Sequence, residues 1–255
     1  PMKPLQAGRS AAHAIDAVRL AAAGLGGAPD ALEAEHGLLR GISPQGRVDT
    51  ARPAQLPRGN WRLVDDGLSV KRYPVCHAAH RAIDAVIALA DAHRLDTADG
   101  RAGTVTVGGA PAETLRYHHP ENALQARFSL HHNVAAALAD RAVGFAQLTD
   151  EYVTRPDVAA LYALTTIVID DSEPCPEQPG LAKFDRVTIG TRGGATLESG
   201  PVRYPKGHAR LPMTDAERAA KFADCARHGG YGDACALLAR LERLERQDNM
   251  MDLFR

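Results

Sequence analysis

The chain has 255 residues, of which 45% are hydrophobic, so it can bury a sizeable core as one large domain or two small ones. Its 30 lysines and arginines are balanced by 31 aspartates and glutamates, which excludes a global field that would recruit nucleic acid or an anionic membrane. The sequence shows no run of about 18 apolar residues and no signal pattern at its start, so we expect a soluble, cytoplasmic chain. The four widely spaced cysteines fit reduced thiols better than a disulfide framework.

Apolar spacing predicts a helix over residues 9–25, and Asp30 can cap a short second helix that ends at Leu32. Residues 43–60 are rich in Pro, Arg and Gly and are interpreted as a surface connection. Two short apolar runs, at 61–64 and 68–70, flank a turn that contains glycine, which indicates a β-hairpin.

Strands and helices then alternate, which indicates a small α+β module from about residue 68 to residue 204. Two further helices follow Pro205, and the first of them begins at the capping box formed by Thr214 and Glu217. The order of helices, mixed module and helices suggests that the last helices return to the domain begun by the first. We expect helices over 77–93, 122–143, 156–164, 214–228 and 233–246, and strands over 104–107, 165–169 and 186–189.

Residues 71–85, KRYPVCHAAHRAIDA, contain the strongest cluster of chemically active side chains. Pro74 biases the residue before it toward an extended backbone, so a helix can begin only after this point. Free backbone N–H groups and the helix dipole would then act together with Lys71 and Arg72 on a carboxylate or phosphate. We therefore expect an anionic substrate at this helix start.

Other interpretations of the same stretch stay open. His77 and His80 lie three apart on a helix and could supply acid/base groups, or this face could simply be polar. Cys76 would need a lowered pKa to act as a nucleophile, which a helix start could provide. A zinc site could combine Cys76 and His80 with Cys225 and His228, although neither pair has the spacing of a zinc finger.

Two histidine pairs, at residues 118–119 and 131–132, form a second signal. Adjacent residues on a helix point about 100° apart, so only one member of the second pair can face a given pocket. Residues 206–208, Lys-Gly-His, form a third candidate, which could equally be a solvent-exposed loop.

Four sequence blocks occur in a characteristic order along nearly the whole chain. They are KPLQAGR at 3–9, KRYP followed by HRAIDA within 71–85, RFSL at 127–130 and PMTD at 212–215. Together they resemble the MmgE/PrpD family, which includes 2-methylcitrate dehydratases, cis-aconitate decarboxylase and iminodisuccinate epimerase.

The resemblance implies a discontinuous all-helical domain with an inserted smaller α+β lid domain, and an active site between them that needs no metal or organic cofactor. Here it implies a partial helical domain at 1–66, the lid at 67–205 and returning helices at 206–255. Family substrates are small di- or tricarboxylates, and the reactions begin with a proton on a carbon next to a carboxylate. Such chemistry needs a positioned base and nearby cations.

The resemblance also assigns site residues. Lys3 and Lys71 match family lysines and are expected to bind substrate carboxylates, while His80 or His77 would serve as acid/base. His132 stands where many members have tyrosine, so an imidazole could replace a phenol as proton donor. The expected substrate-binding residues are Arg9, Arg72, Tyr73, Cys76 and His208.

Three functional hypotheses follow. The first is a 2-methylcitrate dehydratase-like lyase, with a decarboxylase or an epimerase of the same family as the alternative. Members usually carry a helical half before the first block, so the second is one subunit of a split enzyme that associates with such a half; a homodimer is also expected. The third is a binding module without catalysis.

Overall fold

The structure is a computed structural model that describes residues 2–49, 59, 61–95, 97, 100–176, 181–247 and 249. The chain divides into two compact units, residues 1–61 and residues 62–255. Within the described residues, no helix is both long and apolar enough to cross a membrane.

The first unit contains the helices α1 (Met2–Ala22) and α2 (Leu38–Ile42) and the 3-10 turn η1 (Pro44–Gly46). Helix α1 begins earlier than predicted because a proline is tolerated in the first turn of a helix, where the N–H it lacks has no partner anyway. The predicted second helix at residues 30–32 is wrong, because these residues form turns. Most of the predicted connection at 43–60 lies outside the described residues.

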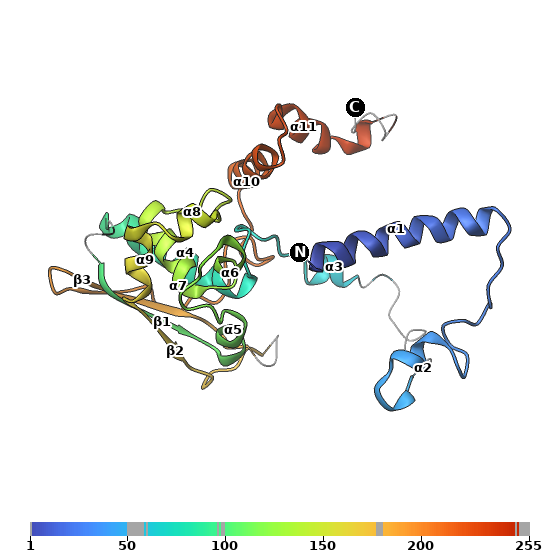
Figure 1. The fold of residues 1–255 in the computed structure, drawn as a ribbon, viewed down its shortest axis with the longest axis horizontal. Helices are drawn as coiled ribbons and strands as arrows, with labels where there is room; N and C mark the ends of the chain where they lie inside the picture. The colour runs from blue at the N-terminus through green and yellow to red at the C-terminus, as the bar shows by residue number, and fades with distance from the viewer. Residues whose placement is uncertain are drawn as a thin grey trace. The chain divides into compact units, whose positions relative to one another are not determined.

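The second unit holds the sheet and the helices that pack on it (Figure 1). Its helices are α3 (Arg62–Asp65), α4 (His80–His93), α5 (Gly109–Thr114), α6 (Ala123–Ala126), α7 (Leu130–Asp140), α8 (Asp150–Val153), α9 (Pro156–Tyr162), α10 (Asp215–His228) and α11 (Ala234–Leu241). Two 3-10 turns, η3 (His77–Ala79) and η4 (Leu244–Arg246), precede α4 and follow α11. The strands are β1 (Gly100–Val107), β2 (Thr165–Ile169), β3 (Arg186–Thr191) and β4 (Thr196–Glu198).

The strands form one mixed sheet in the order β2-β1-β3-β4. Strand β1 pairs in parallel with β2 and antiparallel with β3, and β4 pairs antiparallel with β3. The three predicted strands are therefore confirmed, and β4 was not predicted because it has only three residues. Helices and one mixed sheet confirm the α+β class, while the insertion of a lid domain stays a prediction.

The core lies between one face of the sheet and helices α4, α7 and α9 (Figure 1). Side chains alternate between the two faces of a strand, so Val105, Val107, Val187 and Ile189 all point into this core and are buried. Helix α4 contributes its apolar face, on which Ile83 is fully buried. This packing fixes the start of α4 against the sheet.

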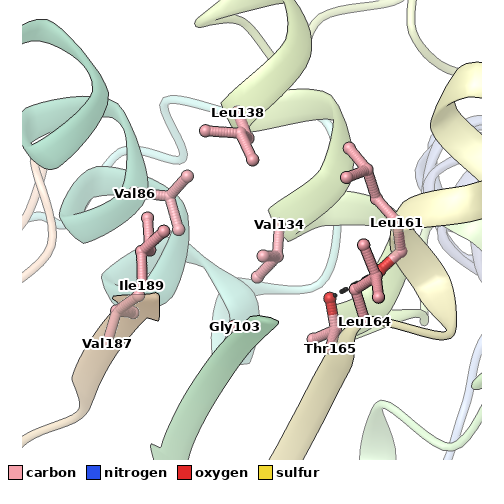
Figure 2. A pocket seen from close by; sticks show the side chains of 9 residues that line it. All are labelled: Val86, Gly103, Val134, Leu138, Leu161, Leu164, Thr165, Val187 and Ile189. Atoms are coloured by element: carbon pink, nitrogen blue, oxygen red, sulfur yellow. Dashed lines mark hydrogen bonds between the residues drawn. The ribbon is translucent and has the colours of Figure 1, made fainter. Parts of the chain in front are cut away.

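A small apolar cavity of about 30 Å³ remains in this core (Figure 2). It lies among the side chains of the sheet and helices α4, α7 and α9, at the point where β1 carries Gly103. Gly103 carries a hydrogen atom where other residues carry a side chain, and the neighbouring valines and leucines do not fill the space that this leaves.

The predicted hairpin at residues 61–70 is wrong. Residues 62–65 form the single helical turn α3, and Val70 donates its backbone N–H to the carbonyl of Gly207 at 2.8 Å. The apolar side chains of this stretch, those of Leu63, Val64 and Leu68, are exposed and do not pack on the core. A two-stranded hairpin without such packing is only marginally stable.

The predicted helix at 122–143 is divided into α6 and α7. Ser129 interrupts it with an extended backbone and caps α7, accepting a hydrogen bond from the backbone N–H of His132 at 3.1 Å. The helices predicted at 77–93, 156–164 and 214–228 are confirmed, including the capping box of Thr214 and Glu217 at the start of α10. The helix predicted at 233–246 is shorter, because α11 ends at Leu241 and the 3-10 turn η4 follows it.

Candidate functional site

The second unit contains a cavity of about 650 Å³ between the start of α4 and the loop at residues 203–210, which we call the cationic cavity. Five separate stretches of the chain contribute to it, so it depends on the folded unit and on no single motif. Its lining residues are Asp66, Gly67, Ser69, His77, Ala78, Arg81, Pro111, Cys175, Leu181, Arg203, Tyr204, Pro205, His208 and Arg210.

The charge of this lining is strongly one-sided. Arg81, Arg203 and Arg210 supply three guanidinium groups, against the single carboxylate of Asp66. Two imidazoles lie among these cations. A cavity with this lining is suited to a small molecule with more than one carboxylate, because each guanidinium can bind a carboxylate through two parallel hydrogen bonds.

His77 belongs to the turn η3, one helical turn before Arg81 on α4, so both side chains reach the same cavity. Burial is the main reason that the pKa of His77 lies below its ordinary value, and the charges of Lys71 and His208 and then of Arg81 lower it further. A neutral imidazole at neutral pH has a free lone pair and can accept a proton.

His208 faces His77 from the loop at 203–210. Its Nδ1 accepts the backbone N–H of Arg210 at 3.0 Å, and its ring stacks on Tyr204 with centroids 4.5 Å apart. In the neutral ring this bond leaves the proton on Nε2, where it can be donated. The two imidazoles can therefore take complementary roles, one as acceptor and one as donor.

Gly207 determines the path of this loop. Its φ is +92°, and a Cβ at this position would lie 2.2 Å from the carbonyl oxygen of Val70. Asp84 on α4 also holds the loop, by accepting the backbone N–H of Lys206 at 2.6 Å.

Arg81 is anchored from behind. Its Nη1 donates to the carbonyl of Ala182 at 3.0 Å and lies 3.5 Å from the carboxylate of Asp185. Asp185 is 2% exposed, and burial raises its pKa to about 7 although Arg81 acts in the opposite direction.

Two of the ten predicted site residues, His77 and His208, line the cationic cavity. Lys71 is exposed and donates from Nζ to the carbonyl of Val75 at 2.8 Å, and its charge acts on the pKa values of His77 and His80. Lys71 therefore lies close to the cavity without being part of its lining.

Arg72 and Tyr73 face a different environment. Arg72 pairs with Asp84 at 3.7 Å and with Glu217 at 3.6 Å, and it lines a second cavity of about 530 Å³. The hydroxyl of Tyr73 donates to Asp84 at 2.6 Å in the protein interior. These contacts hold residues 72–73, just before α4, to α4 itself and to α10.

His80 is fully buried beneath the rings of Tyr73 and His77, at centroid distances of 5.1 and 4.8 Å. Among the described residues, neither ring nitrogen has a well-formed hydrogen bond, although the backbone of Tyr73 and Val75 lies near enough to raise its pKa slightly. Burial outweighs this effect and, with the charges of His77 and Lys71, lowers the pKa of His80 to about 3. Cys76 is half-buried beside it.

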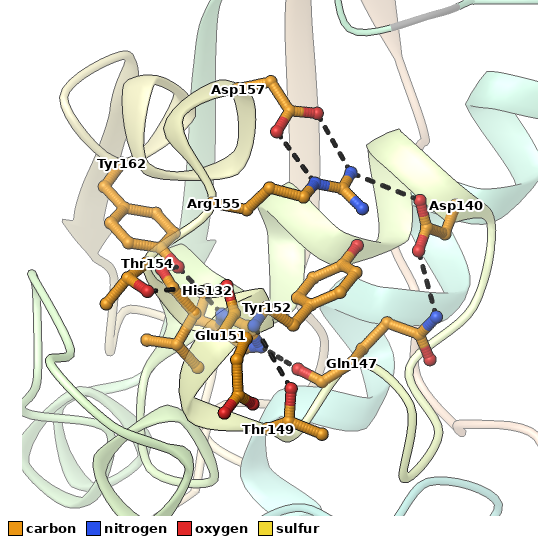
Figure 3. A network of polar contacts seen from close by, with 11 residues as sticks. His132, Asp140, Gln147, Thr149, Glu151, Tyr152, Thr154, Arg155, Asp157 and Tyr162 are labelled. Carbon is orange, nitrogen blue, oxygen red and sulfur yellow. Dashed lines mark hydrogen bonds and ion pairs between the residues drawn. The ribbon is translucent and has the colours of Figure 1, made fainter.

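His132 lies in a buried polar network of α7, α8 and α9 (Figure 3). Its Nδ1 lies 2.9 Å from the hydroxyl of Tyr162, and its Nε2 lies 2.9 Å from the carbonyl of Gln147. Burial lowers the pKa of His132 to about 4. The network continues through the side chain of Gln147 to Asp140 and from there to Arg155.

The remaining predicted residues belong to the first unit. Arg9 is exposed on α1, and the side chain of Lys3 lies outside the described part of the chain. In that described part, no group of three or more His, Cys, Asp or Glu side chains could hold a metal ion, so the zinc alternative finds no such cluster there.

Sequence reasoning missed the three arginines of the cavity. Arg81 lies inside the predicted stretch but was not among the expected site residues. A signal for the other two was present, because residues 203–210 place two arginines, a lysine and a histidine around one glycine.

Comparison with known proteins agrees with the sequence blocks. The family model described as the MmgE/PrpD C-terminal domain matches residues 73–240, which include most of the cationic cavity. No curated protein matches the chain. Because the family model covers well over half of its length, the chain belongs to the MmgE/PrpD family and carries the C-terminal domain of that family.

Proposed function

We propose that the cationic cavity binds a small di- or tricarboxylate and removes a proton from a carbon next to one of its carboxylates, as in a 2-methylcitrate dehydratase-like lyase. One observation supports this proposal: three arginines and two histidines line one cavity. Removing such a proton places negative charge on the adjacent carboxylate, and fixed cations stabilise that charge as it develops.

His77 is the favoured base, because it lines the cavity and its pKa is lowered, while His80 is fully buried. In a dehydration, the proton on Nε2 of His208 could pass to the departing hydroxyl group. Epimerisation would use the same base and cations, whereas decarboxylation would release CO₂ and need an imidazole to donate a proton to the carbanion that is left. Product analysis must therefore distinguish the three reactions. The family resemblance implies that no cofactor takes part.

The binding step is tested by calorimetry with fumarate as the probe. We expect Arg81→Gln to weaken fumarate binding about ten- to hundredfold, which is the usual contribution of a hydrogen bond between charged groups. Arg192→Gln makes the same change in charge at an exposed position on the β3–β4 connection and should leave binding unaltered. Equal affinity in all three proteins would contradict the proposal.

The chemical step is tested by NMR after incubation of the full chain with 2-methylcitrate in D₂O. We expect deuterium at the carbon next to a carboxylate, an unsaturated product, or both. His77→Asn should abolish either signal, and so should Lys71→Ala if this lysine binds a carboxylate at the edge of the cavity. Undiminished turnover in His77→Asn would exclude His77 as the base.

We further propose that the chain functions with a helical partner, or as a homodimer, with residues 67–205 acting as a lid. The exposed apolar side chains of α1, among them Leu5, Ile15 and Val18, support this proposal. A cytoplasmic location is consistent with the lack of a disulfide among the cysteines that the structure describes. A monodisperse monomer in light scattering, with α1 fully exposed to protease, would contradict the proposed partner.

A further inference from the structure

The pair formed by Arg81 and Asp185 differs from the other ion pairs near the cationic cavity. Asp185 lies behind the cavity and is 2% exposed, while Arg81 reaches the cavity surface. Within the described part of the chain, no residue other than Arg81 supplies a charge that acts on the pKa of Asp185. Arg81 therefore contacts an internal carboxylate and also lines the cavity.

The contact between the two groups is loose. The distance of 3.5 Å between Nη1 and Oδ1 exceeds the 2.7–2.9 Å or so of a charged hydrogen bond. Oδ1 of Asp185 has no hydrogen bond among the described residues. The closer partner of the guanidinium is the carbonyl of Ala182, at 3.0 Å, which carries no net charge.

The cost of a buried carboxylate depends on its counter-ion. When Arg81 turns its charge toward a bound carboxylate, Asp185 loses part of the only opposing charge that stabilises its ionised form. The response with the lowest free energy is for Asp185 to take up a proton.

We propose that Asp185 is an internal counter-ion of Arg81, and that an anionic substrate displaces it, so that binding in the cationic cavity is coupled to the uptake of up to one proton by Asp185. The proton comes from solvent, and no bond of the substrate changes. This inference rests on the proposed function, because it requires an anion in the cavity. Asp185 is thus a positioning residue, since it acts on the substrate through Arg81.

Burial already raises the pKa of Asp185 to about 7, so the coupling is expected in the neutral range. Below this pKa Asp185 is neutral, and Arg81 is available to bind the carboxylate of the substrate. Above it, the ionised carboxylate of Asp185 competes with the substrate for Arg81. Affinity for an anion should therefore fall as pH rises through about 7. The other titratable and charged residues of the cavity lining are Asp66, His77, Cys175, Arg203, Tyr204, His208 and Arg210.

The test measures fumarate binding to the full chain by calorimetry between about pH 6 and pH 8.5, where both carboxyl groups of fumarate remain ionised. In the natural protein we expect affinity to fall with rising pH and binding near pH 7 to take up protons, detected by comparing buffers with different ionisation heats. In Asp185→Asn, affinity at pH 8 should rise by about tenfold, one pKa unit of coupling, and the dependence on pH should flatten.

Asp91→Asn is the matched control, because Asp91 also pairs with an arginine, Arg141 at 3.0 Å, but outside the cationic cavity. This variant should bind as the natural protein does. If Asp185→Asn keeps the affinity and the pH profile of the natural protein, the inference is overturned while the proposed function stands. If neither protein binds fumarate, the proposed function fails, and the inference fails with it.

A second measurement covers the case in which Asp185→Asn does not fold. Proton uptake is then measured in the double variant His77→Asn and His208→Asn, in which neither imidazole of the cavity can accept the proton. Retained uptake supports Asp185 as the acceptor. Loss of all uptake with fumarate still bound overturns it.

Discussion

Gly207 is the residue on which the loop of the cationic cavity depends most directly. We predict that Gly207→Ala lowers the free energy of unfolding by about 3 kcal/mol or more, because the new methyl group would overlap the carbonyl of Val70. Fumarate binding should weaken as well, since His208 and Arg210 belong to the same loop. Urea unfolding and calorimetry measure the two effects.

Gly200→Ala provides the control for this prediction. Gly200 also has a positive φ, of 66°, but nothing lies within 4 Å of the position of its Cβ. This variant should lose only about 1 kcal/mol, the cost of a left-handed conformation for alanine. Equal losses in the two variants would show that backbone strain, and not the contact with Val70, restricts the loop.

At the residue level, the sequence could indicate a lining residue of the cavity where that residue belongs to a local pattern. His77 could be predicted because it follows Pro74 at the start of a helix. The role of Arg81 could not, because it depends on Asp185 and on the loop at 203–210, which only the folded chain brings near. His80 looked equivalent to His77 in spacing, yet packing against Tyr73 buries it completely.

At the scale of elements, the contact of β1 with the helices leaves the small apolar cavity of Figure 2. We predict that Gly103→Ala raises the free energy of unfolding by about 0.5–1 kcal/mol, because the methyl group enters open apolar space and the unfolded chain loses freedom. Thermal unfolding would show a higher midpoint.

Gly103→Ser tests the reason for this gain. Serine has a similar size but brings a hydroxyl group into a cavity lined by apolar side chains, which costs about 1–3 kcal/mol without a partner. We therefore expect it to be less stable than Gly103→Ala. If the two variants are equally stable, the cavity does not behave as an apolar space.

Helices and strands that pack on the core were predicted correctly more often than exposed segments. Strands β1 and β3 and helix α4 were predictable because apolar side chains recur on the face that enters the core. The structure of residues 61–70 could not be predicted in this way, because the apolar residues of this stretch are exposed and packing does not determine their conformation. The break between α6 and α7 depends on the cap at Ser129, which competes with a continuous helical pattern.

At the scale of the whole molecule, buried neutral histidines make stability depend on pH. Burial lowers the pKa of His80 to about 3 and those of His131 and His132 to about 4, from 6.5. A lowered histidine pKa stabilises the fold above pH 6.5, and this stabilisation is lost as pH falls toward 4. Each group contributes about 3 kcal/mol, so we predict acid unfolding within this interval, followed by circular dichroism.

His80→Phe should make this dependence shallower by about one proton, or roughly 1.4 kcal/mol per pH unit, because the apolar ring fills the same site and does not titrate. The same substitution at His13, which is exposed on α1, is the control and should leave the slope unchanged. An unaltered slope in His80→Phe would mean that the acid sensitivity arises elsewhere.

Binding of polycarboxylates in the cationic cavity is tested by NMR titration of the full, isotope-labelled chain with fumarate. We expect saturable shifts centred on His77, Arg81, His208 and Arg210, which share this cavity. Saturable shifts centred instead on Arg72 and Lys206 in the second cavity, or no shifts at all, would contradict it.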